Sequence, residues 1–198
     1  MLNIGLLLKL AVLMVNKVFL EIGTCDFDTC LPLAEQGWSG YMVEGDPTHA
    51  ESMKKQTSRY DVEVRNLAIS DYDGLIEFHT SSADKGWIKG IGTVASDNHI
   101  GERLLTEDRY SRHIKETISI PCSTLDTFLT ESNIDHLDFM KIDTEGHELN
   151  ILGSYSWRVK PTMVKIEHSH IDDVLMCNML KSQGYMVWTE KQDIYGVV

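Results

Sequence analysis

The sequence predicts an α/β fold, in which a mostly parallel sheet carries helices on both faces. Short apolar runs of strand-like pattern alternate with helical patterns at the spacing of βα units, which is typical of parallel sheets. The 198 residues are 42% hydrophobic and 24% charged, a composition that favours a globular chain with a sizeable core. Because no repeat, linker or low-complexity tract interrupts the pattern, we expect residues 1–198 to form a single domain.

Strands are expected where a short apolar run ends at a turn signal. The core strands are expected at residues 18–22, 40–44, 62–68, 137–143 and 163–168, and a closing hairpin at residues 185–190 and 194–198. Residues 75–79 alternate between apolar and polar side chains after the Asp73-Gly74 turn, which predicts an added edge strand. The same alternation resumes at residues 117–120.

The predicted helices are recognised by their start signals. Asp46-Pro47 supplies an N-cap followed by a proline at the first helical position, and Thr124 caps a helix that presents Leu125, Phe128 and Leu129. Further helices are expected from about residue 28 to residue 37, from residue 145 to residue 153, and before Gly184, where Leu175, Met179 and Leu180 form the apolar pattern.

Two segments need separate interpretation. Residues 2–15 are strongly apolar, but the run is shorter than the roughly 18 residues that span a membrane, and Lys9 interrupts it. We expect residues 1–16 to form a helix that covers the sheet, without a stable membrane span; a peripheral membrane contact is the alternative. Residues 80–115 are polar, contain four glycines and show weak periodicity, which predicts a substrate lid or insertion.

The charge balance and the cysteines limit the partners and the compartment. The chain has 18 Lys and Arg against 30 Asp and Glu, a net charge of −12, and no basic stripe, so nucleic-acid binding is disfavoured. A cationic ligand is electrostatically easier to bind than an anionic one. The cysteines, at positions 25, 30, 122 and 177, form no C-x-x-C pair. We interpret them as free thiols in a reducing compartment and expect a cytoplasmic protein.

The loop after the first strand predicts a ligand site. Ligands of open parallel sheets bind at the carboxyl ends of the strands, where Glu21 is followed here by Gly23, and Glu44 ends the second strand in a position to bind ribose hydroxyls. Asp26 and Asp28 would repel a dinucleotide pyrophosphate by about 4 kcal/mol per close pair. They favour S-adenosylmethionine, which carries a sulfonium and an ammonium and no phosphate. The alternative is a tight turn with Asp28 as a helix N-cap and Glu44 as a solvated strand end.

Several segments resemble FkbM-type methyltransferases. The most specific is residues 139–148, which contain the block K-I-D-x-E-G-x-E beginning at Lys141. The supporting segments are residues 67–71, 73–78, 124–126, 152–153, 161–167 and 184–185. The resemblance covers roughly residues 17–190. The first loop departs from the family pattern, because Thr24, Cys25 and Phe27 stand where family members usually carry alanine, asparagine and a second glycine.

The resemblance implies a class I, Rossmann-like methyltransferase fold: a seven-stranded, mostly parallel sheet with an antiparallel last strand. It also implies S-adenosylmethionine as cofactor and O-methylation of a hydroxyl on a sugar, glycan or secondary metabolite, so the expected partner is a small-molecule or carbohydrate acceptor. The oligomeric state stays open. The expected cofactor-binding residues are Glu21, Gly23, Thr24, Asp26, Asp28, Glu44, Gly45, Asp46, Ala68, Ile69 and Asp143.

The candidate catalytic residues follow the fourth and fifth core strands, whose ends are neighbours in this fold. They are Asp143, Glu145, Glu167 and His168. These residues also have structural interpretations. Asp143 could cap the following helix, Glu145 or Glu167 could form a buried ion pair with Lys141, and the histidines could be polar residues whose hydrogen bonds are satisfied within the chain. Asp143, Glu167 and His168 or His170 could also ligate a divalent ion, but no spacing is diagnostic, so no metal is predicted.

Two other functions stay open at this stage. The first is a nicotinamide-dependent oxidoreductase on the same fold, against which stand the acidic first loop and the lack of a Tyr-x-x-x-Lys pair. The second is a non-catalytic binding module that has kept the methyltransferase fold and lost turnover, and the altered first loop favours it. A methyltransferase is the prediction that fits most of the chain.

Overall fold

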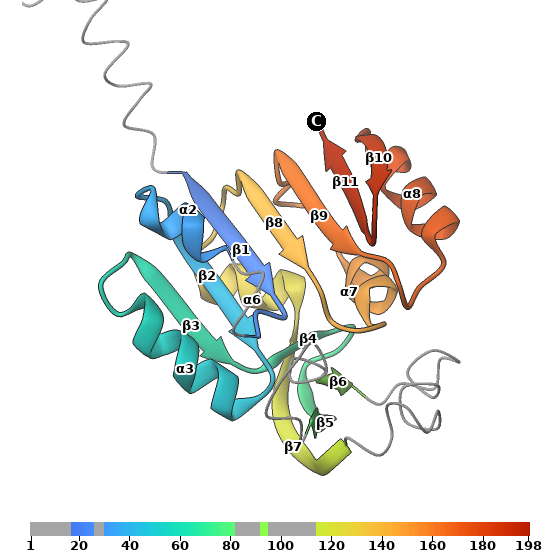
Figure 1. Ribbon diagram of the computed structural model, residues 1–198. Helices are drawn as coiled ribbons and strands as arrows, with labels where there is room; N and C mark the ends of the chain where they lie inside the picture. Colours follow the sequence, from blue (N-terminus) through green and yellow to red (C-terminus); the bar gives the residue numbers. More distant parts are fainter. Residues whose placement is uncertain (1–16, 26–29, 82–91, 95–113) are drawn as a thin grey trace, which may run out of the picture.

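The computed structural model describes residues 17–25, 30–81, 92–94 and 114–198 (Figure 1). Three predictions lie partly or wholly outside these residues: the helix at residues 1–16, the side chains of Asp26 and Asp28, and most of the lid at residues 80–115. Among the residues that are described, no helix is long and apolar enough to cross a membrane.

The main sheet has seven strands in the order β10-β11-β9-β8-β1-β2-β3. Its strands are β1 (Val18–Ile22), β2 (Ser39–Glu44), β3 (Val62–Asn66), β8 (Phe139–Ile142), β9 (Met163–Glu167), β10 (Met186–Glu190) and β11 (Asp193–Val197). The pairs from β3 through β9 are parallel, whereas β11 runs antiparallel to both β9 and β10. The predicted mixed α/β class is therefore confirmed, and the sheet itself is mixed.

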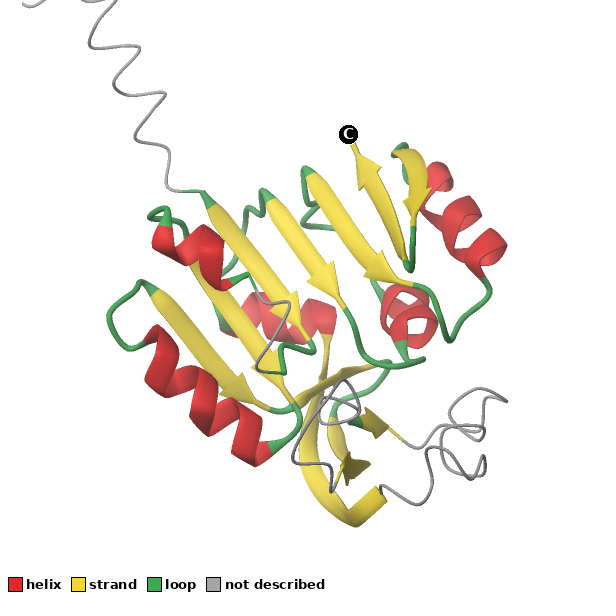
Figure 2. Cartoon of the chain, viewed as in Figure 1, coloured by secondary structure: helices red, strands yellow, loops and turns green. Residues whose placement is uncertain are grey.

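Helices cover both faces of this sheet, as Figure 2 shows. On one face α2 (Leu31–Glu35) and α3 (Pro47–Thr57) pack on β1, β2 and β3; on the other lie α6 (Leu125–Glu131), α7 (Glu148–Ser154) and α8 (Asp173–Ser182). Residues alternate between the two faces along each strand. In β1, Leu20 and Ile22 belong to the larger core under α6, α7 and α8, whereas Phe19 belongs to the smaller core under α2 and α3.

The helix starts agree with the sequence where a side chain caps the helix. The side chain of Asp46 accepts hydrogen bonds from the backbone N–H groups of Thr48 and His49 with Pro47 in the first turn, and Thr124 accepts one from Thr127. Elsewhere the predictions differ. The helix predicted from about residue 28 begins at Leu31, and Leu175 on α8 is 51% exposed because Met176 and Leu180 face the core instead.

A second, four-stranded sheet follows β3 along the chain (Figure 1). It consists of β4 (Ala68–Ser70), β7 (Ile114–Thr124), β5 (Gly74–Ser81) and β6 (Thr93–Val94), in that spatial order. The prediction that residues 75–79 extend the main sheet as an edge strand is therefore wrong. The physical reason is that the apolar face of β5 is buried against β7, where Ile76 lies opposite Ile120 and Phe78 opposite Ile118.

Candidate active site at the carboxyl ends of the strands

The turn after β1 brings two chain segments into backbone contact. Gly23 has a φ of +78°, and its N–H donates to the carbonyl of Val43 at 2.9 Å. A Cβ atom at this position would overlap the carbonyl group of Asp143. Because only glycine combines this backbone conformation with this close approach, Gly23 fixes the loop after β1 against the end of β8.

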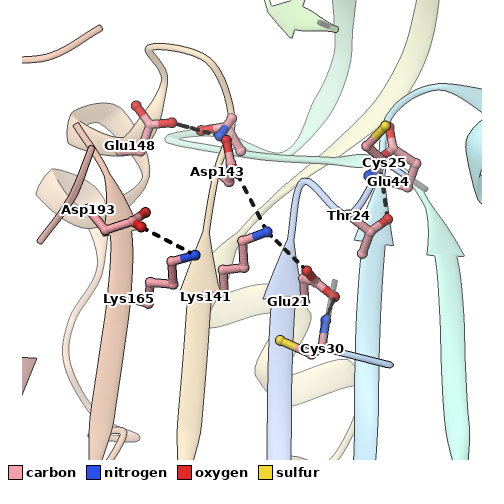
Figure 3. A network of polar contacts seen from close by, with 11 residues as sticks. Glu21, Thr24, Cys25, Cys30, Glu44, Lys141, Asp143, Glu148, Lys165 and Asp193 are labelled. Atoms are coloured by element: carbon pink, nitrogen blue, oxygen red, sulfur yellow. Dashed lines mark hydrogen bonds and ion pairs between the residues drawn. The ribbon is translucent and has the colours of Figure 1, made fainter. Parts of the chain in front are cut away.

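Glu44, at the end of β2, is the centre of a buried group of hydrogen bonds (Figure 3). Its Oε2 atom accepts from the hydroxyl of Thr24 at 3.2 Å and from the N–H of Cys25 at 2.7 Å, and its Oε1 atom accepts from the N–H of Asp46 at 2.8 Å. Burial raises the pKa of Glu44, although the N–H groups of Asp46 and Cys25 act in the opposite direction. Three of the roughly four acceptor positions of this carboxylate are therefore already used within the chain.

Lys141 connects two carboxylates on the same face of the sheet. Glu21 on β1 lies opposite Lys141 on β8, and Lys141 lies opposite Lys165 on β9. The Nζ atom of Lys141 is 3.3 Å from Oε1 of Glu21 and 3.5 Å from Oδ2 of Asp143 (Figure 3). The other carboxylate oxygen of Glu21 accepts from the N–H of Cys30 at 2.8 Å, at the start of α2. Lys165 forms its own ion pair with Asp193 at 3.4 Å.

Burial dominates the electrostatics of both carboxylates. It raises the pKa of Glu21 from 4.5 to about 7, although Lys141 and the N–H of Cys30 stabilise the charged form. Burial also raises the pKa of Asp143 from 3.8 to about 6; Lys141 lowers it, and Glu145 and Glu167 add to the rise. The side chain of Asp143 is 27% exposed, whereas that of Glu21 is completely buried.

The loop between β8 and α7 is held by a third buried carboxylate. Glu148, the first residue of α7, accepts hydrogen bonds from the N–H and the hydroxyl of Thr144 at 2.7 and 2.9 Å and from the N–H of Gly146 at 3.1 Å. Burial raises the pKa of Glu148 to about 8. Glu145 and Gly146 have φ values of +56° and +106°, which an α-helix does not contain. The prediction that this helix begins at residue 145 is therefore wrong.

The loop after β9 meets the loop after β8 through an ion pair. Nε2 of His170 lies 3.1 Å from Oε2 of Glu145, and this hydrogen bond raises the pKa of His170. One oxygen of Glu167 accepts from the N–H of Ser169 at 2.7 Å, and burial raises the pKa of Glu167. Among the described residues, neither the other oxygen of Glu167 nor Nε2 of His168 has a hydrogen-bond partner, although both atoms are buried.

The second sheet contacts these loops directly. The hydroxyl of Ser70 in β4 lies 3.0 Å from Nε2 of His147, and the hydroxyl of Thr93 in β6 donates to the carbonyl of Glu145 at 3.3 Å. Phe78 of β5 packs against the turn after β2, where a Cβ atom on Gly45 would lie 2.5 Å from its ring. The second sheet is thus attached both to the turn after β2 and to the loop after β8.

No cluster suited to a metal ion occurs in the part of the chain that the structure describes. The four cysteines are free, as the sequence predicts. The described part of the site consists of carboxylates, one buried lysine and the loops that these groups hold in place.

The family can be assigned from the sequence as a whole. The model of the methyltransferase FkbM domain matches residues 18–187, which is most of the chain and extends from the start of β1 into β10. The chain belongs to the FkbM methyltransferase family. This confirms the resemblance found in the K-I-D-x-E-G-x-E block.

Solved structures and curated sequences add little to the family assignment. A ribosomal protein L11 methylase from Lactobacillus delbrueckii subsp. bulgaricus is similar at 10% identity and a TM-score of 0.43, over 96% of this chain and 73% of that chain. We draw nothing further from a similarity of this size. No curated protein sequence matches the chain at a significant level.

The FkbM domain brings the predicted site residues together in two groups. The first joins Thr24, Glu44 and Asp46, and the second joins Glu21, Asp143, Glu145 and Glu167 around the ends of β1, β8 and β9. Ala68 and Ile69 are buried in β4, with their side chains in two different cores. Asp26 and Asp28 lie outside the described residues.

The structure contradicts two structural roles that the sequence offered, one for Lys141 and one for Asp143. Lys141 does form buried ion pairs, and in the described part of the chain these pairs are with Glu21 and Asp143, not with the predicted Glu145 or Glu167. Asp143 is not the cap of the following helix, because the N-cap position of α7 is occupied by His147. The acid at the end of β8 therefore has no capping function.

Sequence reasoning missed Glu148 and Ser70 as residues that shape the site. Glu148 was noted only as part of the family block, yet its carboxylate holds the loop that carries Glu145. The sequence does indicate this contact, because Glu148 follows Gly146 by two residues, and an acid in that position can accept hydrogen bonds from the N–H groups of a tight turn. The contact of Ser70 with His147 joins residues 77 positions apart, and no local pattern indicates it.

Proposed function

We propose that this FkbM domain is an S-adenosylmethionine-dependent methyltransferase that methylates a hydroxyl of a small-molecule or carbohydrate acceptor. The observation that carries the proposal is the set of carboxylates at the carboxyl ends of the parallel strands, with Glu44 at the end of β2, Asp143 after β8 and Glu167 at the end of β9. The order of the seven strands and the reversed β11 support a class I methyltransferase fold, which has this arrangement.

The residues fit the charge of this cofactor. S-adenosylmethionine carries a sulfonium and an ammonium, and the buried carboxylate of Glu21 and the partly exposed carboxylate of Asp143 favour such a cation, whereas a pyrophosphate would be repelled. Glu44 is the residue proposed for the ribose, with Gly23, Thr24, Gly45 and Asp46 around it. Ala68 and Ile69 are proposed to line the cofactor site from β4, and Asp26 and Asp28 to contribute from the first loop.

Proton removal from the acceptor hydroxyl is the step that the chain must supply. When bound, the cofactor provides the methyl group and the leaving group. Asp143 is partly exposed and carries its charge above a pKa of about 6, so we assign it to accept the hydroxyl proton on a carboxylate oxygen. Glu145 and Glu167 are proposed to orient the hydroxyl. Among the described residues, the second oxygen of Glu167 has no hydrogen-bond partner and is a further acceptor. Nε2 of His168 also has none, and it accepts in the tautomer that carries the proton on Nδ1.

Calorimetric titration with S-adenosylhomocysteine and NAD tests the cofactor class. Binding of S-adenosylhomocysteine alone supports the methyltransferase, and binding of NAD alone would replace it with an oxidoreductase. A screen of hydroxylated acceptors with methyl-labelled S-adenosylmethionine then tests the reaction. Labelled product that requires an acceptor hydroxyl supports O-methylation, whereas product that carries the label on nitrogen contradicts it.

A non-catalytic methyltransferase-fold module is the second candidate. The observation that favours it is the first loop, where Thr24 and Cys25 already occupy one oxygen of Glu44. A ribose that binds both oxygens of Glu44 would have to displace these contacts. Failure of the folded protein to bind either S-adenosylhomocysteine or NAD would support this second candidate.

A further inference from the structure

Lys141 occupies a position that is costly for a lysine. Its side chain is 5% exposed, in the central strand β8, and burying an ammonium requires close counter-charges. The counter-charges lie at different depths, because Glu21 is completely buried on the neighbouring strand while Asp143 is 27% exposed at the end of the same strand. The lysine therefore connects the interior of the sheet to the carboxylate that faces the strand-end site.

The three groups Glu21, Lys141 and Asp143 do not balance one another's charge. With all three ionised, two carboxylates and one ammonium leave one net negative charge. Lys165, the next lysine on this face, forms an ion pair with Asp193. Among the described residues, the other titratable and charged groups that face the network are Cys30 at the start of α2, Glu145 with His170, Lys165 with Asp193, and Glu167.

We propose that Lys141 is a positioning residue that keeps the carboxylates of Glu21 and Asp143 ionised and close together, so that these three side chains present one net negative charge to the cationic end of the methyl donor. This inference rests on the proposed function. It adds a preference for the methyl donor over the product of methyl transfer, which the function alone does not require. The donor is a sulfonium, whereas the product of methyl transfer is a neutral thioether, so the network favours the donor over the product.

The two carboxylates give this selectivity a pH dependence. Burial raises the pKa of Glu21 to about 7 and that of Asp143 to about 6, and Lys141 lowers both. As the pH rises through this range the carboxylates lose protons, the network gains negative charge, and the preference for the donor increases. Without the ammonium of Lys141, both carboxyl groups keep their protons to higher pH, so the preference for the donor over the product develops only at higher pH.

The first experiment uses the protein without ligand. Carbon-13 NMR of the labelled side-chain carboxyls follows the titration of Asp143 in the unmodified protein and in Lys141→Met. We expect the midpoint to rise by about one pH unit or more, the scale on which a neighbouring opposite charge shifts a carboxyl group. Lys141→Arg restores the cation and should restore the midpoint. Lys165→Met is the matched control, since it removes a lysine from the same face whose ion pair is with Asp193.

The second experiment measures binding of S-adenosylmethionine and S-adenosylhomocysteine by calorimetry from pH 5 to pH 9. We expect the ratio of the two affinities to favour the donor at high pH in the unmodified protein, and the pH at which this preference develops to rise in Lys141→Met. A purely structural function of Lys141 would weaken both ligands alike at every pH. Equal effects on both ligands, or an unchanged carboxyl titration in Lys141→Met, would overturn the proposal.

The two experiments separate the inference from the proposed function. If the unmodified protein binds neither ligand, the proposed function fails, while the carboxyl titration still decides whether Lys141 controls Asp143. If Lys141→Met does not fold because it leaves Glu21 unpaired, the double variant Glu21→Gln, Lys141→Met removes both charges of that pair. Its titration is then compared with that of Glu21→Gln alone, and an identical Asp143 midpoint in the two would refute the proposal.

Discussion

Replacing Asp143 with asparagine should make the protein more stable and nearly inactive. The side chain keeps its size, so no cavity forms, and Asp143 is not a helix cap whose loss would destabilise α7. What changes is the charge. Burial makes the ionised form of Asp143 less favourable in the folded chain than in the unfolded chain, which raises its pKa from 3.8 to about 6.

The magnitude and the pH range follow from this pKa. Between pH 4 and pH 6 the folded state holds a proton that the unfolded state has released, so the free energy of unfolding decreases as the pH rises. At about 1.4 kcal/mol per pKa unit, the rise from 3.8 to about 6 corresponds to at most about 3 kcal/mol. Asp143→Asn lacks this penalty. It should match the unmodified protein near pH 4 and exceed it by up to about 3 kcal/mol at pH 8.

Two assays on the same preparation test this prediction. Urea unfolding at pH 4 and pH 8 measures stability, and single-turnover methyl transfer at saturating donor measures the chemical step. Loss of a positioned acid–base group should lower the rate by roughly 10²- to 10⁴-fold. A variant with an unchanged rate would assign the chemistry to Glu167 and His168. A variant less stable at pH 8 than the unmodified protein would show that the reasoning about burial is incorrect.

Three further substitutions test the framework of the site. Glu44→Ala leaves the hydroxyl of Thr24 and the N–H groups of Cys25 and Asp46 without their acceptor. It should lower the free energy of unfolding in urea by about 3 kcal/mol and weaken binding of S-adenosylmethionine by about 1.5–3 kcal/mol. Glu44→Gln should lose less stability. Gly23→Ala combines a φ of +78° with overlap on the neighbouring backbone and should lose more than about 3 kcal/mol; a normal melting temperature would contradict the geometry. Glu148→Ala should increase amide hydrogen exchange in the loop after β8 more than Glu148→Gln does, and equal exchange in the two would contradict its function as an acceptor.

Local chemistry explains which elements could be predicted from the sequence. The main strands and the helix starts at Asp46 and Thr124 depend on side-chain periodicity and capping, both of which act within a few residues. The family block was found for the same reason, since its residues are consecutive in the chain. The strand-end acids could also be predicted, because parallel strands bring their carboxyl ends to one edge of the sheet.

The remaining features depend on pairing between distant residues. Alternation in residues 75–79 indicates a strand but not its partner, and β5 pairs with β7 about 40 residues later in the chain. The ion pair between Lys141 and Glu21 joins residues 120 positions apart. The start of α7 was misplaced for a different reason: Glu145 adopts a positive φ, which is uncommon for a residue other than glycine and has no signal in the residue type.

The acidic edge of the main sheet also has a kinetic consequence. Glu44 ends β2, Glu167 ends β9, and Asp143 and Glu145 follow β8, all at the carboxyl ends of parallel strands in a chain whose net charge is −12. A surface with one sign of charge can accelerate the encounter with an oppositely charged ligand by about 10- to 1,000-fold, and salt screens this effect over about 8 to 10 Å. A cation should therefore associate faster at low ionic strength, while nucleotides with phosphate groups are slowed on approach. Dependence of the association rate on salt would thus distinguish ligands before any of them reaches the site.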